Sequence, residues 1–191
     1  MNAKDQLIVQ QNRLDKVQAE IGQWSRYNFG FQQSKRTGAV LGSINPLLGM
    51  CEEYFEWKTA ETDADAEDAI SDQLIYLCDW GCREGILLSK LLGDCPMEFQ
   101  GNRETAMELL IHASLKAHQG IREYADPLYY RQRVENAVRT LFYALDHMFD
   151  GEGPEPWLSA LEQTWAKVKN RDWQKRPNDA HLTASNVELA K

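Results

Sequence analysis

The chain has 191 residues, of which 43% are hydrophobic, and a formal net charge of −8. This length and hydrophobic content suffice for one domain with a buried core. The negative balance lacks the basic footprint of nucleic-acid-binding proteins, so we exclude a nucleic acid as the main partner. No stretch approaches the roughly 18 apolar residues of a membrane span, and the start lacks a signal-peptide pattern. We therefore expect a cytoplasmic protein without a membrane segment.

The first half of the chain carries three helical patterns. Apolar residues at helical spacing predict a helix over residues 4–27. A second helix is expected to begin at Pro46, because proline is favoured in the first helical turn. Thr62 and Asp63 are both plausible N-caps of a third helix, which we expect to run to about Leu92.

The second half continues the helical patterns. Residues 103–121 and 130–149 are predicted to form two helices joined by a short connection at Asp126 and Pro127. A last helix is expected from Trp157 to about Lys169, followed by a polar end. No apolar run is both alternating and bounded by hairpin turns, so the sequence predicts an all-α fold. The four cysteines form no C-x-x-C pair, and we expect no disulfide framework or zinc site.

The chain is interpreted as one domain over residues 1–191, built from two tandem helical hairpins. Residues 44–93 form an acidic hairpin, residues 102–150 form a second, degenerate hairpin, and residues 155–177 form a C-terminal helix and lid. The segments "EDAISDQLIYLCD" and "ENAVRTLFYALD" align with each other, but the acidic residues of the first are replaced in the second. We expect a four-helix core from the two hairpins, with the N-terminal and C-terminal helices added to it.

Acidic residues at helical spacing mark the first hairpin. Glu53 and Glu56 share one face of a helix, and Asp68 and Asp72 share a face of the next. Antiparallel packing would point these four carboxylates at one another, where their repulsion requires compensation. Apolar neighbours surround them in the sequence, namely Leu48, Phe55, Leu74 and Ile75. Oxygen ligands suit hard cations, so we expect a Mg²⁺ site that Mn²⁺ could also fill.

The acidic residues have two other interpretations. The first is a solvated face of an acidic protein, which suits the acids outside the inward-facing positions: Glu52, Glu61, Asp63, Asp65 and Glu67. The second is an EF-hand in "DADAEDAISDQL". Its sixth position is Asp68, where glycine is required, and its twelfth is Leu74, where glutamate is required. The EF-hand is therefore excluded.

The segment "LLGMCEEYFEW" followed by "EDAISDQLIYLCDW" resembles the MazG-like all-α nucleotide pyrophosphohydrolases. Their pattern is E-E-x-x-E, a spacer and then E-x-x-D, and this chain matches it at Glu52, Glu53, Glu56 and Asp72. The chain departs from the pattern at Ala69, three residues before Asp72, where the family has glutamate. The ligand role would then pass to Asp68. The resemblance implies Glu52 and Glu53 as catalytic residues.

Two further stretches resemble segments of MazG-like proteins: "HASLKAHQGIR" and "TWAKVKNRDW". The resemblance implies hydrolysis of a nucleoside triphosphate between its α and β phosphates, giving a monophosphate and pyrophosphate. Substrate-binding residues chosen from these stretches are Lys116, Gln119, Arg122, Lys169, Arg171 and Trp173. Trp165 or Trp173 could stack on a base, but ordinary packing is the competing interpretation.

Two alternative functions stay open. The missing glutamate at Ala69 could make the chain a catalytically inactive helical module for nucleotide sensing or protein interaction. A dUTPase-like specialist would differ only in its base pocket, about which spacing says nothing. MazG-like folds often build their core across subunits, so we also expect a homodimer.

Overall fold

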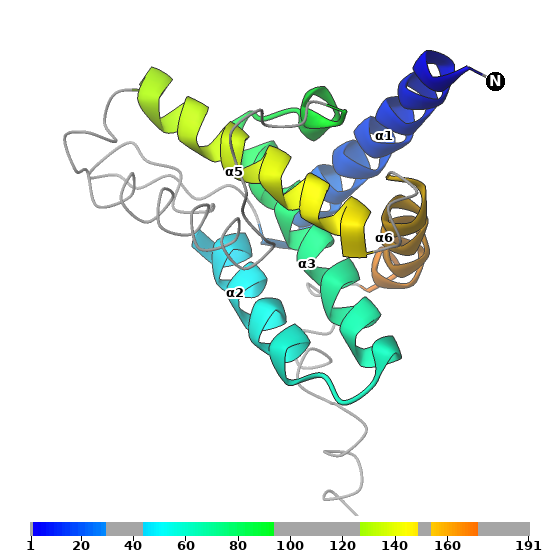
Figure 1. Ribbon diagram of the computed structural model, residues 1–191. Coiled ribbons are helices and arrows are strands. Elements are labelled where there is room, and N and C mark those ends of the chain that lie inside the picture. Colours follow the sequence, from blue (N-terminus) through cyan, green and yellow to red (C-terminus); the bar gives the residue numbers. More distant parts are fainter. Residues whose placement is uncertain (1, 30–43, 94–126, 149–153, 172–191) are drawn as a thin grey trace, which may run out of the picture.

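The computed structural model describes residues 2–29, 44–93, 127–148 and 154–171. They form five α-helices and one short 3₁₀ helix, without a strand in these four segments (Figure 1). The helices are α1 (Ala3–Phe29), α2 (Ile44–Thr59), α3 (Asp63–Glu84), η2 (Leu88–Leu91), α5 (Pro127–Met148) and α6 (Glu155–Val168). The predicted all-α class is confirmed.

Helices α2 and α3 form the acidic hairpin that the sequence predicts. Thr62 caps α3, because its hydroxyl oxygen accepts a hydrogen bond from the backbone N–H of Asp65 at 3.2 Å. The prediction that this helix continues to about Leu92 is wrong, because α3 ends at Glu84. Gly85 adopts a left-handed conformation with φ of 68°, which breaks the helix and is a frequent C-terminal signal.

The segment after α3 is held against α1 by a buried glutamine. The side chain of Gln18 donates to the carbonyl of Ile86 at 2.8 Å and accepts from the N–H of Leu88 at 3.0 Å. Both backbone groups lie in the turn that leads from Gly85 into η2, so the glutamine supplies the partners that the interrupted helix no longer provides.

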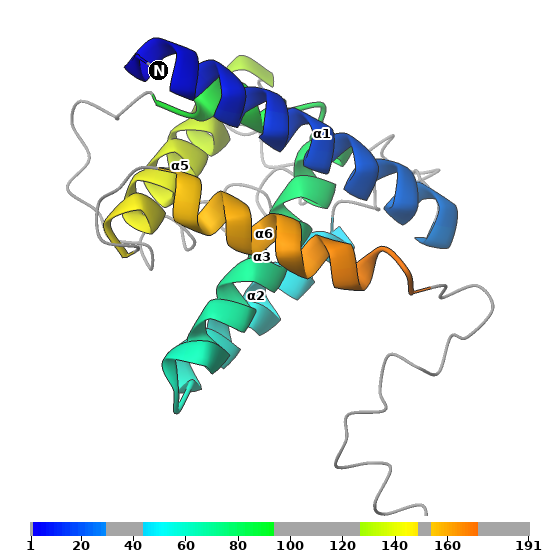
Figure 2. The ribbon, with the colours of Figure 1, turned by 90° about the vertical axis from the view of Figure 1, so that its right-hand side faces the viewer.

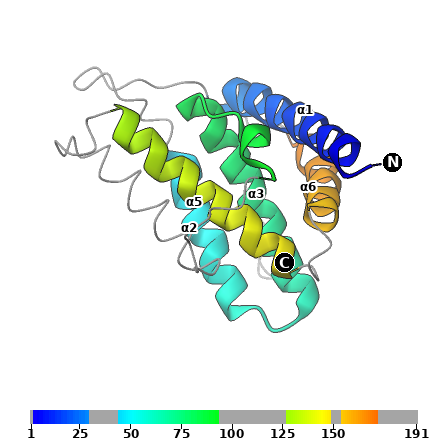
Figure 3. The ribbon, with the colours of Figure 1, turned by 45° about the horizontal axis from the view of Figure 1, so that its top comes forward.

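Helix α3 lies at the centre of the described structure. It packs against α2, α1 and α6, and Figure 3 shows α5 on one side of it and α1 with α6 on the other. Trp80 of α3 and Trp157 of α6 are fully buried, and the ring of Trp157 stacks on Phe142 of α5 at 5.1 Å. Side chains from all six elements share one hydrophobic core.

Helices α1 and α6 run close together across α3 (Figure 2). Arg13 of α1 joins them, since its guanidinium contacts Glu155 and Glu162 of α6 at 2.7 Å. Side chains of both helices are also part of the hydrophobic core. From the sequence we expected these two helices to be added to a core formed by the two hairpins. The first helix of the predicted second hairpin lies outside the described residues, so the four-helix core stays a prediction.

Two smaller expectations concern cysteines and membranes. Cys51, Cys78 and Cys82 carry free thiols, and Cys95 lies outside the described residues. None of the described helices is both long and apolar enough to cross a membrane.

Candidate functional site

Glu53 and Asp79 are the two buried carboxylates of the described structure. Asp79 is paired with the guanidinium of Arg83 at 2.9 Å, and Arg83 also donates to the hydroxyl of Ser25 at 2.6 Å. Glu53 is only 9% exposed, and burial is the main cause that raises its pKa. The buried polar atoms without a hydrogen-bond partner among the described residues are Asp15 Oδ1 and Trp80 Nε1, so the oxygens of Glu53 are not fully enclosed. A carboxylate in such surroundings is stabilised by a cation.

Asp72 of α3 is the charge that acts most strongly on Glu53. Burial raises the pKa of Glu53 to about 8, and the negative charges of Asp72 and Glu56 add to this rise. The pKa of Asp72 is raised to about 6, chiefly by burial and then by the charge of Asp68. The two carboxylates thus belong to one electrostatic unit between α2 and α3.

The other predicted acids lie around this pair rather than inside it. Glu52, Glu56 and Asp68 are exposed, and the charges of Glu56 and Asp68 act on both Glu53 and Asp72. That the four carboxylates point at one another stays a prediction. Residues three apart differ by about 60° around a helix, so Glu56 is rotated away from the buried position that Glu53 occupies. Their charges still raise the pKa of Glu53. They form a negative rim around the inner pair.

Two of the four apolar residues expected around the acids are buried, and the other two are exposed. Leu74 and Ile75 are buried as expected, but Leu48 is 59% exposed and Phe55 is 65% exposed. The inward positions of α2 belong instead to Met50 and Tyr54, which are part of the hydrophobic core.

Two apolar residues occupy the inward positions one turn before the inner pair. Met50 precedes Glu53 by three residues and is fully buried, and Ala69 precedes Asp72 by three residues and is 4% exposed. The side chain of Gln73 donates to the carbonyl of Met50 at 3.0 Å and locks the two helices together at this level. Accordingly, the described residues contain no group of three or more acids, histidines or cysteines arranged to hold a metal ion.

Tyr76 lies next to the inner pair and was missed by the sequence interpretation. Burial raises the pKa of its phenol to about 12, with Glu53 and Asp72 adding to the rise. A Cβ atom added at Gly49 would lie 2.5 Å from the Tyr76 ring, so α2 passes directly against this ring. The only signal in the sequence was the spacing of four residues between Asp72 and Tyr76.

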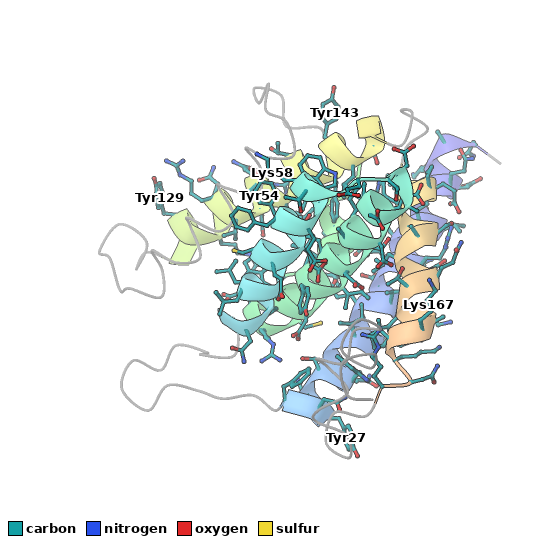
Figure 4. The ribbon with its side chains drawn as sticks, turned by 90° about the horizontal axis from the view of Figure 1, so that it is seen from below. Tyr27, Tyr54, Lys58, Tyr129, Tyr143 and Lys167 are labelled. Carbon is teal, nitrogen blue, oxygen red and sulfur yellow. The ribbon has the colours of Figure 1, made fainter. Side chains whose placement is uncertain are left out.

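Positive charge reaches the pair from α6 and the residues after it. Arg171 lowers the pKa of Asp72, and Lys167 does so to a smaller extent. Arg171 was predicted as a substrate contact, whereas Lys167 was not; it projects from α6 in Figure 4. Lys169 is exposed and is not among the charges that act most strongly on Asp72. Four other predicted substrate contacts lie outside the described residues: Lys116, Gln119, Arg122 and Trp173.

Aromatic side chains fix the position of Arg171. The indole N–H of Trp24 donates to the carbonyl of Arg171 at 3.0 Å. Trp24 also meets Trp165 edge to face at 5.6 Å, and Trp165 is buried with its N–H donating to Glu20 at 2.9 Å. Trp165 is therefore a core residue, as the packing interpretation expected.

No protein-family model, curated protein or solved structure that we compared with the chain matches it. Two inward carboxylates, an acidic rim and two neighbouring cations could together bind a divalent cation and an anionic ligand.

Proposed function

We propose that the protein is a Mg²⁺-dependent nucleoside triphosphate pyrophosphohydrolase. It would convert a ribo- or deoxyribonucleoside triphosphate and water into the monophosphate and pyrophosphate. The observation that supports this most is Glu53, a buried carboxylate without a described partner beside the half-buried Asp72. A divalent cation would offset the repulsion between the two acids, and Mn²⁺ could replace Mg²⁺.

The residues present fit such a cation in chemistry. Mg²⁺ is usually held by one or two carboxylates, with waters and substrate phosphates as the other ligands. Glu53 and Asp72 would be these carboxylates. When bound, the ion would screen the phosphate charge and activate water. The negative rim would offer Glu52 as the base that orients the attacking water, with Glu56 and Asp68 as outer ligands.

The basic side chains of Arg171 and Lys167 could neutralise the charge of a triphosphate that the metal ion leaves uncompensated. The positive charges of Arg171 and Lys167 lower the pKa of Asp72, so they would also attract the phosphates of a nucleotide bound at the acids. Trp24 holds the backbone of Arg171 and so limits its movement. The site thus combines carboxylates for a cation with basic groups for an anion, as hydrolysis of a phosphoanhydride requires.

Release of pyrophosphate from a panel of nucleoside triphosphates tests this function. We expect Mg²⁺-dependent release with the wild-type protein and loss of at least 100-fold in Glu53→Gln, on the order of other electrostatic groups of active sites. Glu61→Gln removes an exposed acid of the same hairpin and should leave the rate unchanged. Equal rates in wild type and Glu53→Gln, or no release from any nucleotide, would contradict the proposal.

The inactive module is the second candidate. It is favoured by Met50 and Ala69, which place apolar side chains where further metal ligands would stand. A module of this kind would bind nucleotides without producing pyrophosphate, and the same panel measured by calorimetry and by product release separates the two candidates.

A pyrophosphohydrolase would act on the nucleotide pool of the cytoplasm, where we expect the protein to be located. The homodimer stays a prediction, which light scattering of the purified protein would check.

A further inference from the structure

Helix α2 turns one apolar side away from the hydrophobic core. The helix packs chiefly against α3, and Figure 1 shows it at the edge of the described helices. Met50 and Tyr54 face the core, whereas Leu48 is 59% exposed and Phe55 is 65% exposed. These two exposed side chains lie seven residues apart, which is nearly two helical turns, so they point the same way.

Cys51 and Glu52 lie between them on the same side of the helix, because they follow Leu48 by three and four residues. Cys51 is half-buried and Glu52 is exposed. Apolar residues at this spacing form a stripe that a second helix can cover. We call Leu48, Cys51, Glu52 and Phe55 the outer face of α2.

The outer face has an acid at its centre. The ion pairs among the described residues do not include Glu52, and two more exposed acids, Glu56 and Glu61, follow it toward the turn after α2. The carbonyl end of the helix adds to the negative potential there. A helix that covers Leu48 and Phe55 therefore has to bring positive side chains to this face.

A second copy of the chain would meet like charge on the outer face. In a pair related by a two-fold axis, Leu48 of each copy would meet Phe55 of the other, and the axis would pass between Cys51 and Glu52. The two Glu52 carboxylates would then lie on either side of the axis, where their repulsion opposes association. The net charge of −8 on each chain acts in the same direction.

We propose that the outer face of α2 binds an amphipathic helix of another protein, whose apolar residues cover Leu48 and Phe55 and whose lysine or arginine side chains pair with Glu52. Phe55 follows Glu53 by two residues and lies about 200° around the helix from it, on the side away from Asp72. Binding at Leu48 and Phe55 is thus independent of the proposed function.

Two designed peptides of about 18 residues, or five helical turns, serve as probes. Both carry leucines along one side of a helix, flanked by lysines in the basic peptide and by glutamates at the same positions in its acidic twin. Fluorescence anisotropy of the labelled peptides, with the full chain as titrant, gives the dissociation constants. We expect the basic peptide to bind at least about tenfold more tightly than its twin, and this difference to shrink at high salt.

Substitutions locate the bound peptide on the protein. Leu48→Ser and Phe55→Ser should each weaken binding of the basic peptide by about tenfold or more. Glu52→Gln should weaken it and reduce its salt dependence. Ile8→Ser removes an exposed apolar side chain of α1 and should leave the affinity unchanged. Circular dichroism would verify that the variants fold.

Three results would overturn the proposal. The first is equal affinity for the two peptides, or binding that Leu48→Ser and Phe55→Ser leave unchanged. The second is a lower particle mass of Phe55→Ser in light scattering, which would show that a second copy covers the face. The third is a loss of stability in urea for Phe55→Ser but not Ile8→Ser, which would show that another segment of this chain covers it.

Discussion

Asp72 of α3 raises the pKa of Glu53 of α2, and the two acids stand on neighbouring helices that pack through apolar side chains and the buried amide of Gln73. A protein selected only for stability would gain by replacing either acid, because neither forms a salt bridge with a described residue. We expect this pair of acids to lower the free energy of unfolding, and unfolding measurements can test this.

Glu53→Gln should make the protein more stable at neutral and alkaline pH. The folded pKa of Glu53 is about 8 and its ordinary value is 4.5, so the folded state binds the extra proton between these values. Its contribution to stability is complete below pH 4.5 and is lost as the pH rises through 8, with a slope of up to about 1.4 kcal/mol per pH unit. Urea unfolding between pH 5 and 9 should show this decline in wild type and a flatter profile in Glu53→Gln. A decline of the same slope in the variant would contradict the assignment.

Arg171→Gln should shift the acid side of the pH–rate profile to higher pH. Arg171 lowers the pKa of Asp72, so its removal raises this pKa above about 6, and more of Asp72 is then protonated near neutral pH. KM for the nucleotide should rise by about tenfold or more, as for the loss of a charge-assisted hydrogen bond. Lys167→Gln should shift the profile less, and Lys90→Gln, which removes an exposed lysine that is not among the charges acting most strongly on Asp72, is the matched control with no shift. A profile that shifts equally in all three variants would show a general charge effect instead.

Gly49→Ala should destabilise the hairpin by about 1–3 kcal/mol, in the range of overpacked cores. The added methyl group would lie 2.5 Å from the Tyr76 ring and would force α2 and α3 apart. Urea unfolding of Gly49→Ala, Tyr76→Leu and the double variant measures the coupling between the two positions. The double variant should recover part of the loss, whereas additive losses would show that the two residues do not touch.

Arg83→Met should destabilise the protein by about 3–5 kcal/mol at neutral pH, because it leaves Asp79 buried without its cation. Burial already raises the pKa of Asp79 and Arg83 opposes this rise, so the pKa should rise further in the variant. The loss should therefore be smaller at acidic pH, where Asp79 is protonated. Unfolding at pH 5 and pH 8 measures the difference, and Asp79→Asn combined with Arg83→Met should be milder than Arg83→Met alone.

The helices could be predicted from the sequence because their apolar residues recur with the helical period. The predicted helix over residues 4–27 corresponds to α1. Thr62, one of the two residues that the sequence suggested as the N-cap of the third helix, is the N-cap of α3. The extension to Leu92 failed because the apolar pattern continues past Gly85, although a glycine is a common signal for the end of a helix. The left-handed backbone conformation of Gly85 shows that the helix stops there.

The site was less predictable, because burial depends on which helices cover a face. Glu53 and Glu56 are three residues apart on one helix, and helical spacing alone predicts the same face for both. The structure buries Glu53 and exposes Glu56. The contact between Gly49 and Tyr76 joins residues far apart in the sequence, and Lys167 acts on Asp72 from another helix. These relationships arise from tertiary packing, about which helical periodicity carries no information.

The most direct measurement is the anomalous scattering of Mn²⁺ in a crystal of the protein grown with an α,β-imido nucleoside triphosphate. We expect one peak between α2 and α3, within bonding distance of carboxylate oxygens of both Glu53 and Asp72 and of a phosphate oxygen. A nucleotide bound with its metal elsewhere on the protein, or these two carboxylates turned toward separate surfaces, would contradict the account.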